Sequence, residues 1–102
     1  MIHVIATVNL KPGCREKFLE ILNANVPNVL HEDGCLSYEP CIDVDSKFAP
    51  ANPDRVTIVE SWESLDHLNE HLQAPHMQTY SESVKDLRIS IELKIVTPDI
   101  NS

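Results

Sequence analysis

The chain is poor in glycine, in basic residues and in long apolar runs. Only two of its 102 residues are glycine, Gly13 and Gly34, so neither a P-loop nor a dinucleotide-binding fingerprint can be written. Eight basic residues stand against sixteen acidic ones, and the resulting net charge of −8 is repelled by the phosphate backbone of nucleic acids. No basic cluster for an anionic membrane is present either. We therefore expect neither nucleic acid nor a membrane among the partners.

Cysteine is also scarce. There are three cysteines, Cys14, Cys35 and Cys41, and no two of them form a C-x-x-C pair. The odd number and the spacing argue against a zinc ribbon and a disulfide scaffold. We interpret all three as small buried residues, because nothing in the sequence places a base beside any of them. The first residues carry no basic segment and no small-residue cleavage site. The sequence therefore predicts no signal peptide, no membrane span and a cytoplasmic location.

What the chain does have is regular alternation of apolar and polar residues. Positions 2–10, 35–44, 55–62 and 87–96 follow a period of two and predict four β-strands. Pro40 predicts that the second strand lies at a sheet edge or contains a bulge, because proline donates no hydrogen bond to a neighbouring strand. Residues 45–54, with two prolines, predict a loop.

Two further segments follow the period of a helix. Residues 14–31 carry one apolar stripe, and Pro27 inside it predicts a kink or an early end near Asn25. Ser64 is a predicted N-cap of the second helix. The apolar face of that helix is predicted from Leu65, Leu68 and Leu72, before Pro75 interrupts the pattern and a helical period continues to residue 84.

The element order β-α-β-β-α-β predicts an α+β fold, with an antiparallel sheet and both helices on one face, in the ferredoxin-like arrangement. We expect a single domain over residues 1–102. The other face of the sheet would still carry Ile5, Val59 and Val96. A second copy of the chain laid on that face would bury them, so we expect a homodimer. Scattered apolar surface is the alternative.

The polar residues that could do chemistry gather between positions 60 and 80. Glu60 alternates with apolar residues on its strand and needs a hydrogen-bond partner, which His71 or a tyrosine hydroxyl could supply. His71 borders the buried stripe of its helix, and a histidine there can accept a proton near neutral pH. For His71 and for His76, which follows Pro75, a purely structural hydrogen bond is the open alternative.

A metal site is a weaker interpretation of the same region. His67 and His71 stand four residues apart and can share a helix face. A site would need a third ligand, such as Glu63 or Glu70. A solvent-exposed acidic helix without a metal would have the same residues. We therefore predict no metal.

Several runs of residues resemble the antibiotic biosynthesis monooxygenase family. They are E-S-W-E-S-L-D-H-L at 60–68, H-L-Q-A-P-H-M at 71–77, Y-S at 80–81, K-P-G at 11–13, E-D-G-C at 32–35 and Y-E-P at 38–40. The resemblance extends over about residues 2 to 98. It implies a dimeric α+β barrel that oxidises quinols or other electron-rich aromatic diols with O₂. It also implies that no flavin, haem or metal is needed, because a deprotonated hydroquinone is itself an electron donor.

The resemblance also implies a set of site residues. His71 is the implied proton acceptor, and Glu60 orients a histidine or holds a substrate hydroxyl. The implied substrate-binding residues are Trp62, His76, Tyr80 and Tyr38, although an aromatic residue in any of these places is also an ordinary core residue.

Two other functions remain open at this point. One is a non-catalytic dimeric module that binds a small aromatic molecule or a reactive carbonyl. The other, suggested by a different relative in the family, is an isomerase of a phosphorylated signalling sugar. Phosphate binding favours arginine or lysine, and residues 56–84 contain neither. Haem degradation is disfavoured because residues 77–85 lack the histidine that haem-degrading relatives use.

Overall fold

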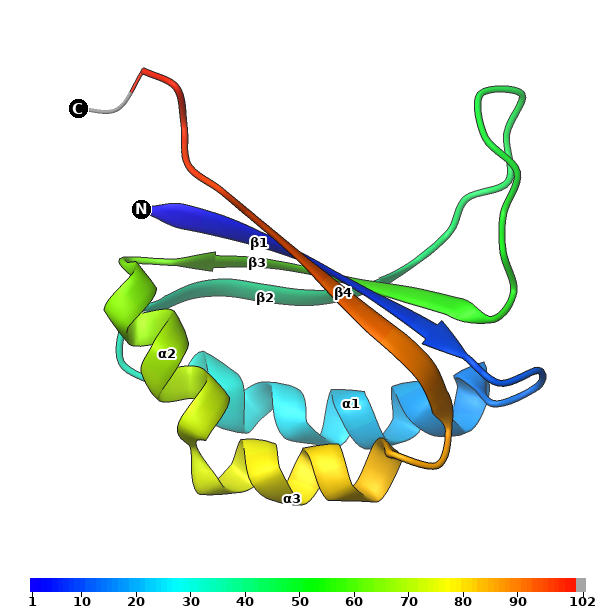
Figure 1. Ribbon diagram of the computed structural model, residues 1–102, viewed down its shortest axis with the longest axis horizontal. Coiled ribbons are helices and arrows are strands. Elements are labelled where there is room, and N and C mark those ends of the chain that lie inside the picture. The colour runs from blue at the N-terminus through cyan, green and yellow to red at the C-terminus, as the bar shows by residue number, and fades with distance from the viewer. Residues whose placement is uncertain (101–102) are drawn as a thin grey trace.

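The computed structural model describes residues 1–100. Its elements are β1 (Ile2–Leu10), α1 (Arg15–Leu30), β2 (Cys35–Ile42), β3 (Arg55–Trp62), α2 (Leu65–Gln73), α3 (Pro75–Val84) and β4 (Arg88–Val96). The strands form one antiparallel sheet in the order β2-β3-β1-β4, and the helices all lie on one of its faces (Figure 1). The α+β, ferredoxin-like fold predicted from the sequence is confirmed.

The predictions made from Pro40 and Pro27 had different outcomes. Pro40 lies in β2, which is an edge strand of the sheet as predicted. Pro27 lies inside α1, which continues to Leu30, so the predicted early end near Asn25 is wrong. Leu22 before the proline and Val29 after it are both fully buried. Packing on the sheet therefore holds the helix through a residue that cannot donate its backbone hydrogen bond.

A sharp break separates α2 from α3. Ala74 is extended, with φ −63° and ψ 141°, and it ends α2 and precedes α3 at once. Pro75 then opens α3, a position where proline is well tolerated because no backbone N–H is needed there. At the other end of α2, the Ser64 side chain accepts a hydrogen bond from the backbone N–H of His67. The predicted N-cap and the predicted interruption are both confirmed.

The hydrophobic core lies between the sheet and the helices. It includes Phe18, Leu22 and Trp62, none of which is exposed at all. On α2 the buried residues are Leu68 and His71, one helical turn apart. Leu72, predicted to face the core, is instead 51% exposed. Because α2 is only nine residues long and buries a single narrow face, Leu72 falls at its margin and His71 takes the inward position.

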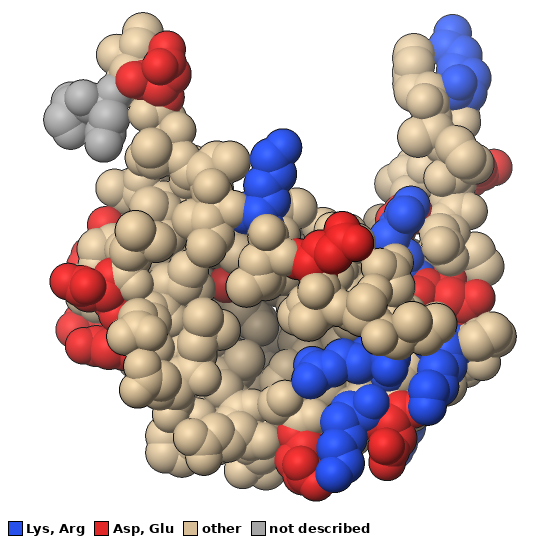
Figure 2. All heavy atoms as spheres, viewed as in Figure 1, with Lys and Arg blue, Asp and Glu red and all other residues tan. Residues whose placement is uncertain are grey.

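A strip of exposed apolar residues runs along β4. Ile91, Leu93 and Ile95 are 45–49% exposed, and each pairs directly with one of the buried β1 residues Val8, Ala6 and Val4. Directly paired residues point to the same face, so this row lies on the helical side of the sheet. In Figure 1, β4 crosses in front of the other strands, and Figure 2 shows uncharged side chains there with a few acidic and basic ones among them.

The exposed row on β4 adds to the apolar surface that the sequence predicts to be uncovered. The sequence places it on the sheet face away from the helices, at Ile5, Val59 and Val96. Ile5 pairs with Val59, and Val96 pairs with His3, so these residues point to that face as predicted. Ile5 and Val59 are partly exposed there, and Val96 is 39% exposed. The helices pack mainly against β2 and β3, so they leave the edge strand β4 uncovered.

The segment between β2 and β3 rises from the sheet on the side away from the helices (Figure 1). Asp43 fixes its base by accepting hydrogen bonds from the Arg55 guanidinium and from the backbone N–H of Asn52. The hydrogen bond from Arg55 is the main cause that lowers the pKa of Asp43.

Two other predictions concern cysteines and membranes. Cys14, Cys35 and Cys41 are free thiols that are partly exposed, so the prediction that all three are buried is wrong. Each lies at or next to an element end or on the edge strand β2, where less of the chain covers it. Over residues 1–100, no helix combines the length and the apolar character needed to cross a membrane.

Candidate functional site

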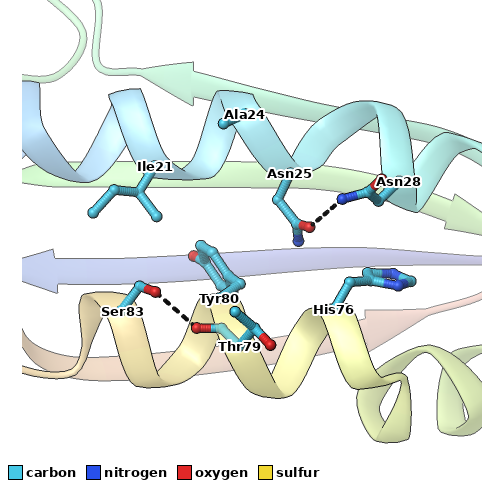
Figure 3. Close-up of a pocket in the computed structure, with 8 residues that line it drawn as sticks. All are labelled: Ile21, Ala24, Asn25, Asn28, His76, Thr79, Tyr80 and Ser83. Atoms are coloured by element: carbon cyan, nitrogen blue, oxygen red, sulfur yellow. Dashed lines mark hydrogen bonds between the residues drawn. The ribbon is translucent and has the colours of Figure 1, made fainter.

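A groove of about 280 Å³ opens between α1 and α3. Figure 3 shows its side chains converging from the two helices. Ile21 and Ala24 make its wall apolar near the middle of α1, and the remaining lining residues are polar or aromatic: Asn25, Asn28, His76, Thr79, Tyr80 and Ser83. Such a mixture of apolar wall and few polar groups is typical of small-molecule sites.

The two asparagines present a fixed amide edge to this groove. The side-chain oxygen of Asn25 accepts a hydrogen bond of 3.1 Å from the Asn28 amide, and Asn25 itself is only 8% exposed. The remaining amide nitrogen of Asn25 lies 3.3 Å from the sulfur of Met77, which is a weak acceptor. Asn25 was not predicted as a site residue, because in the sequence it appears only as a polar residue within a helical stripe.

Tyr80 forms part of the groove and also belongs to the core. Its ring packs edge-on against Phe18, with 6.3 Å between centroids, and burial raises the pKa of Tyr80 to about 12. The hydroxyl therefore keeps its proton at neutral pH and remains available as a hydrogen-bond donor. It is suited to bind a ligand oxygen and not to accept a proton.

Behind the groove, His71 lies in an aromatic cluster. The centroid of its ring is 4.6 Å from that of Trp62 and 5.7 Å from that of Tyr38, and His71 is only 2% exposed. Burial lowers the pKa of His71, while the carboxylate of Glu32 acts in the opposite direction. Burial disfavours the charged form of Tyr38 as well, and so raises the pKa of that side chain. At neutral pH this cluster holds a neutral imidazole between two aromatic rings.

Glu32 connects this cluster with the groove. One of its oxygens, Oε2, lies 2.8 Å from Nδ1 of His71 and 2.7 Å from Nε2 of His76. Glu32 belongs to the turn between α1 and β2 and was missed as a site residue. Its partners are 39 and 44 positions away, and only the packing of α2 and α3 brings them to the turn.

Glu60 is buried at the end of the same cluster. It is 4% exposed, and its Oε1 accepts a hydrogen bond of 2.9 Å from the indole N–H of Trp62. The predicted partner, His71 or a tyrosine hydroxyl, is wrong. Glu60 and Trp62 are two residues apart on β3 and point to the same face, so the indole reaches the carboxyl group first. Burial raises the pKa of Glu60 to about 7, and the hydrogen bond from Trp62 partly offsets this effect.

Glu60→Gln is expected to stabilise the protein at high pH. Between the pKa of about 4.5 in the unfolded chain and the folded value of about 7, the folded state binds the extra proton, so stability falls as pH rises. The difference in unfolding free energy between the variant and the wild type is expected to grow by about 3 kcal/mol from pH 4 to pH 8, in favour of the variant. Urea unfolding followed by circular dichroism measures it. A difference that stays constant with pH contradicts the burial of an ionisable carboxyl group.

The structure thus brings the predicted site residues into two adjoining places. His71, Trp62, Tyr38 and Glu60 lie in the buried cluster, and His76 and Tyr80 line the groove. His76, with its side chain 29% exposed, is the imidazole that a ligand in the groove would meet. The roles predicted for these residues remain predictions.

His67 has a separate environment. Its Nδ1 lies 2.7 Å from the Ser64 hydroxyl and its Nε2 3.6 Å from the Asp33 carboxylate, whereas His71 faces Glu32. The two histidines of the considered metal site therefore point to different partners. In the described part of the chain, no three His, Cys, Asp or Glu side chains are placed to hold a metal ion together.

Comparisons with known proteins agree with this fold and with one another. The family described as "Antibiotic biosynthesis monooxygenase" matches residues 1–83. The probable quinol monooxygenase YgiN of Escherichia coli K12 is 39% identical over 104 residues, which cover 98% of this chain and 100% of YgiN. The fold thus defines an α+β protein of the ferredoxin-like kind, and the chain belongs to the antibiotic biosynthesis monooxygenase family.

Solved structures show the same fold at lower identity. Rv0793 from Mycobacterium tuberculosis has a TM-score of 0.82 and 24% identity, over 99% of this chain and 97% of its own. PA3566 from Pseudomonas aeruginosa has a TM-score of 0.82 and 23% identity, over 95% of this chain and 92% of its own. The family and the relative together support an oxidoreductase of the monooxygenase kind.

Proposed function

We propose that this protein oxidises quinol-like aromatic molecules with O₂, and that the substrate binds in the groove between α1 and α3. The observation that carries the proposal is the position of His76, which lines the groove while its Nε2 contacts the Glu32 carboxylate. A histidine held in this way can take a proton from a phenolic hydroxyl. The relative named as a probable quinol monooxygenase supports the same substrate class.

The groove suits the chemistry in two further respects. Its volume of about 280 Å³ is at the small end of ligand pockets and favours a ligand of one or two rings. Tyr80 keeps its proton and can donate a hydrogen bond to the second oxygen of a quinol. Once deprotonated, the quinol is a good electron donor, and O₂ is the acceptor that we propose.

The predicted proton acceptor, His71, lies behind the groove wall and not at it. We therefore assign proton acceptance at the groove to His76 and place His71 on the far side of the shared carboxylate. Glu60, buried beside Trp62, and Tyr38 then shape the cluster that supports His71.

Homodimer formation and a cytoplasmic location are part of the same proposal. The apolar row of Ile91, Leu93 and Ile95 on β4 is exposed and would be buried by a second copy of the chain. The three free cysteines are compatible with a reducing compartment.

Oxygen uptake by the wild-type protein tests the proposal. We expect the protein to speed O₂ consumption with a reduced naphthoquinone well above the uncatalysed rate, measured with an oxygen electrode. Insertion of one oxygen atom gives water as the second product, and simple oxidation to the quinone gives hydrogen peroxide. Catalase returns half of the consumed O₂ only in the second case, so it separates the two reactions.

Two other outcomes would replace this function. Binding of the naphthoquinol under nitrogen without faster O₂ uptake in air would identify a binding module. Competition by millimolar inorganic phosphate would favour a phosphorylated ligand, although the residues that line the groove include no arginine and no lysine.

A further inference from the structure

Glu32 contacts both histidines of the site, and what it does to their rings goes beyond the proposed function. Its side chain is 13% exposed, and the histidines on its Oε2 come from different helices: His71 from the last turn of α2 and His76 from the first turn of α3. The two contacts, at 2.8 and 2.7 Å, have the length of charge-assisted hydrogen bonds. A carboxylate that meets two imidazoles in this way constrains both rings at once.

The constraint follows from the chemistry of donors and acceptors. An ionised carboxylate can only accept hydrogen bonds, and a neutral imidazole has one N–H and one bare nitrogen. The nitrogen that faces Glu32 must therefore carry the hydrogen, which is Nδ1 in His71 and Nε2 in His76. In a neutral His76 the bare nitrogen is then Nδ1, and within residues 1–100 no group hydrogen-bonds to that atom.

We propose that Glu32 is the positioning residue of the site, which holds His71 as the Nδ1–H tautomer and His76 as the Nε2–H tautomer so that Nδ1 of His76 is the proton acceptor. This inference rests on the proposed function for its catalytic meaning. Its structural content, the tautomer of each ring, stands independently of any turnover.

The surrounding charges favour the same arrangement. The groups around Glu32 are Cys35 and Tyr38 on β2, Glu60 on β3 and the two histidines. The negative charge of Glu32 raises the pKa of Cys35, Tyr38 and Glu60, after the larger effect of burial. In the described part of the chain, no lysine or arginine pairs with Glu32. Only a proton on the histidine pair can balance this carboxylate.

That proton belongs on one histidine at a time. Burial lowers the pKa of His71, and charge on His76 lowers it further. His76 is the more exposed of the two, at 29% against 2%. A proton taken from a ligand in the groove therefore rests on His76, with Glu32 as its counter-ion and with His71 neutral behind it.

Nitrogen NMR of the histidine rings tests the tautomers directly in the wild-type protein. Ring nitrogens that carry hydrogen differ strongly in chemical shift from bare ones. We expect the hydrogen of neutral His71 on Nδ1 and that of neutral His76 on Nε2. The opposite assignment for either ring overturns the proposal, and no variant is needed for this measurement.

The Glu32→Gln variant extends the test. It keeps the shape of the side chain but removes the charge and adds a donor. We expect each ring to become a mixture of tautomers and the pKa of His71 to fall further below its ordinary value, because Glu32 raises it in the wild type. Asp33→Asn is the matched control, since Asp33 is the neighbouring carboxylate, is 90% exposed and, within residues 1–100, pairs with His67 and not with His71 or His76. Its His71 and His76 signals should match the wild type.

Kinetics distinguish positioning from mere support of the fold. With a reduced naphthoquinone, Glu32→Gln is expected to lower kcat at least about tenfold with little change in KM, because a mis-set tautomer impairs proton transfer. Glu32→Asp, which keeps the charge, should recover part of the loss and of the wild-type tautomers. Unchanged tautomers and an unchanged rate in Glu32→Gln overturn the proposal. A wild type that shows the expected tautomers but consumes no O₂ would sink the proposed function and leave Glu32 as the residue that orients two binding-site histidines.

Discussion

His76→Ala is expected to oxidise a reduced naphthoquinone at least about a hundredfold more slowly than the wild type. His76 lines the groove, and its other nitrogen is held by Glu32, so its removal takes away the one imidazole that a bound quinol meets. KM should change little, because the groove walls supplied by Tyr80 and the asparagines remain. Initial rates of O₂ uptake over a range of substrate concentrations measure both parameters.

His67→Ala is the control for this experiment. His67 lies on α2 beside the site, but its ring contacts Ser64 and Asp33 and does not line the groove. The variant should therefore keep the wild-type rate for each folded molecule, whatever it does to stability. Equal losses in His67→Ala and His76→Ala would mean that the rate reports folding and not proton transfer.

His71→Ala locates the proton acceptor. It too should lose most of its activity, because Glu32 would lose one of two donors and the indole of Trp62 would lose its neighbouring ring. The decisive comparison is between the two histidines. If His76→Ala keeps the wild-type rate while His71→Ala is inactive, the acceptor is His71, as the family resemblance implies, and our assignment to the groove-facing ring is wrong.

The second large effect concerns folding. Gly34→Ala is expected to lower the free energy of unfolding by about 3 to 4 kcal/mol. Gly34 has φ +80° and a Cβ built on it overlaps the ring of His67. A left-handed backbone strains alanine by roughly 1–2 kcal/mol, and the overlap must be relieved by moving α2 or the ring. Urea unfolding monitored by the fluorescence of Trp62, which is fully buried, measures the change at fixed protein concentration.

Gly13→Ala is the matched variant for Gly34→Ala. Gly13 has nearly the same backbone angle, φ +79°, with nothing within 4 Å of a Cβ built there. It should cost only the conformational strain, roughly 1–2 kcal/mol. The double variant Gly34→Ala/His67→Ala removes the ring that the new methyl group meets and should recover part of the loss. If Gly13→Ala and Gly34→Ala lower the free energy of unfolding equally, the His67 ring moves away from the new methyl group without a measurable loss of stability.

Local sequence patterns predicted the elements of this fold because their causes are local. Alternation marks the strands, Ser64 marks the start of α2, and Pro40 places β2 at an edge. The errors come from tertiary packing. Pro27 does not end α1, because buried residues on both sides hold the helix on the sheet. The exposed row on β4 was not predicted, because periodicity does not reveal that the helices pack over the other strands.

The candidate site was predictable only in part for the same reason. The histidines, the tryptophan and the tyrosines could be found as chemically capable residues at suggestive spacings. Glu32 could not, because an acidic residue in a turn is ordinary and its role depends on two helices that meet it in space. The hydrogen bond from Trp62 to Glu60 was missed although it joins residues on one strand face, so the pattern of period two held the signal for that contact.

The break at Ala74 and Pro75 has a geometric consequence for the two histidines on Glu32. In an uninterrupted helix, side chains five residues apart diverge by about 140° around the axis, so rings at positions 71 and 76 could not approach one oxygen. The extended Ala74 changes the direction of the chain between the two helices, so the ring of His76 points back toward the ring of His71. A rotation of α3 away from α1 about this joint would widen the groove and move His76 away from the Glu32 carboxylate at the same time. The ability of His76 to accept a proton is therefore linked to how closely α3 packs around a ligand in the groove.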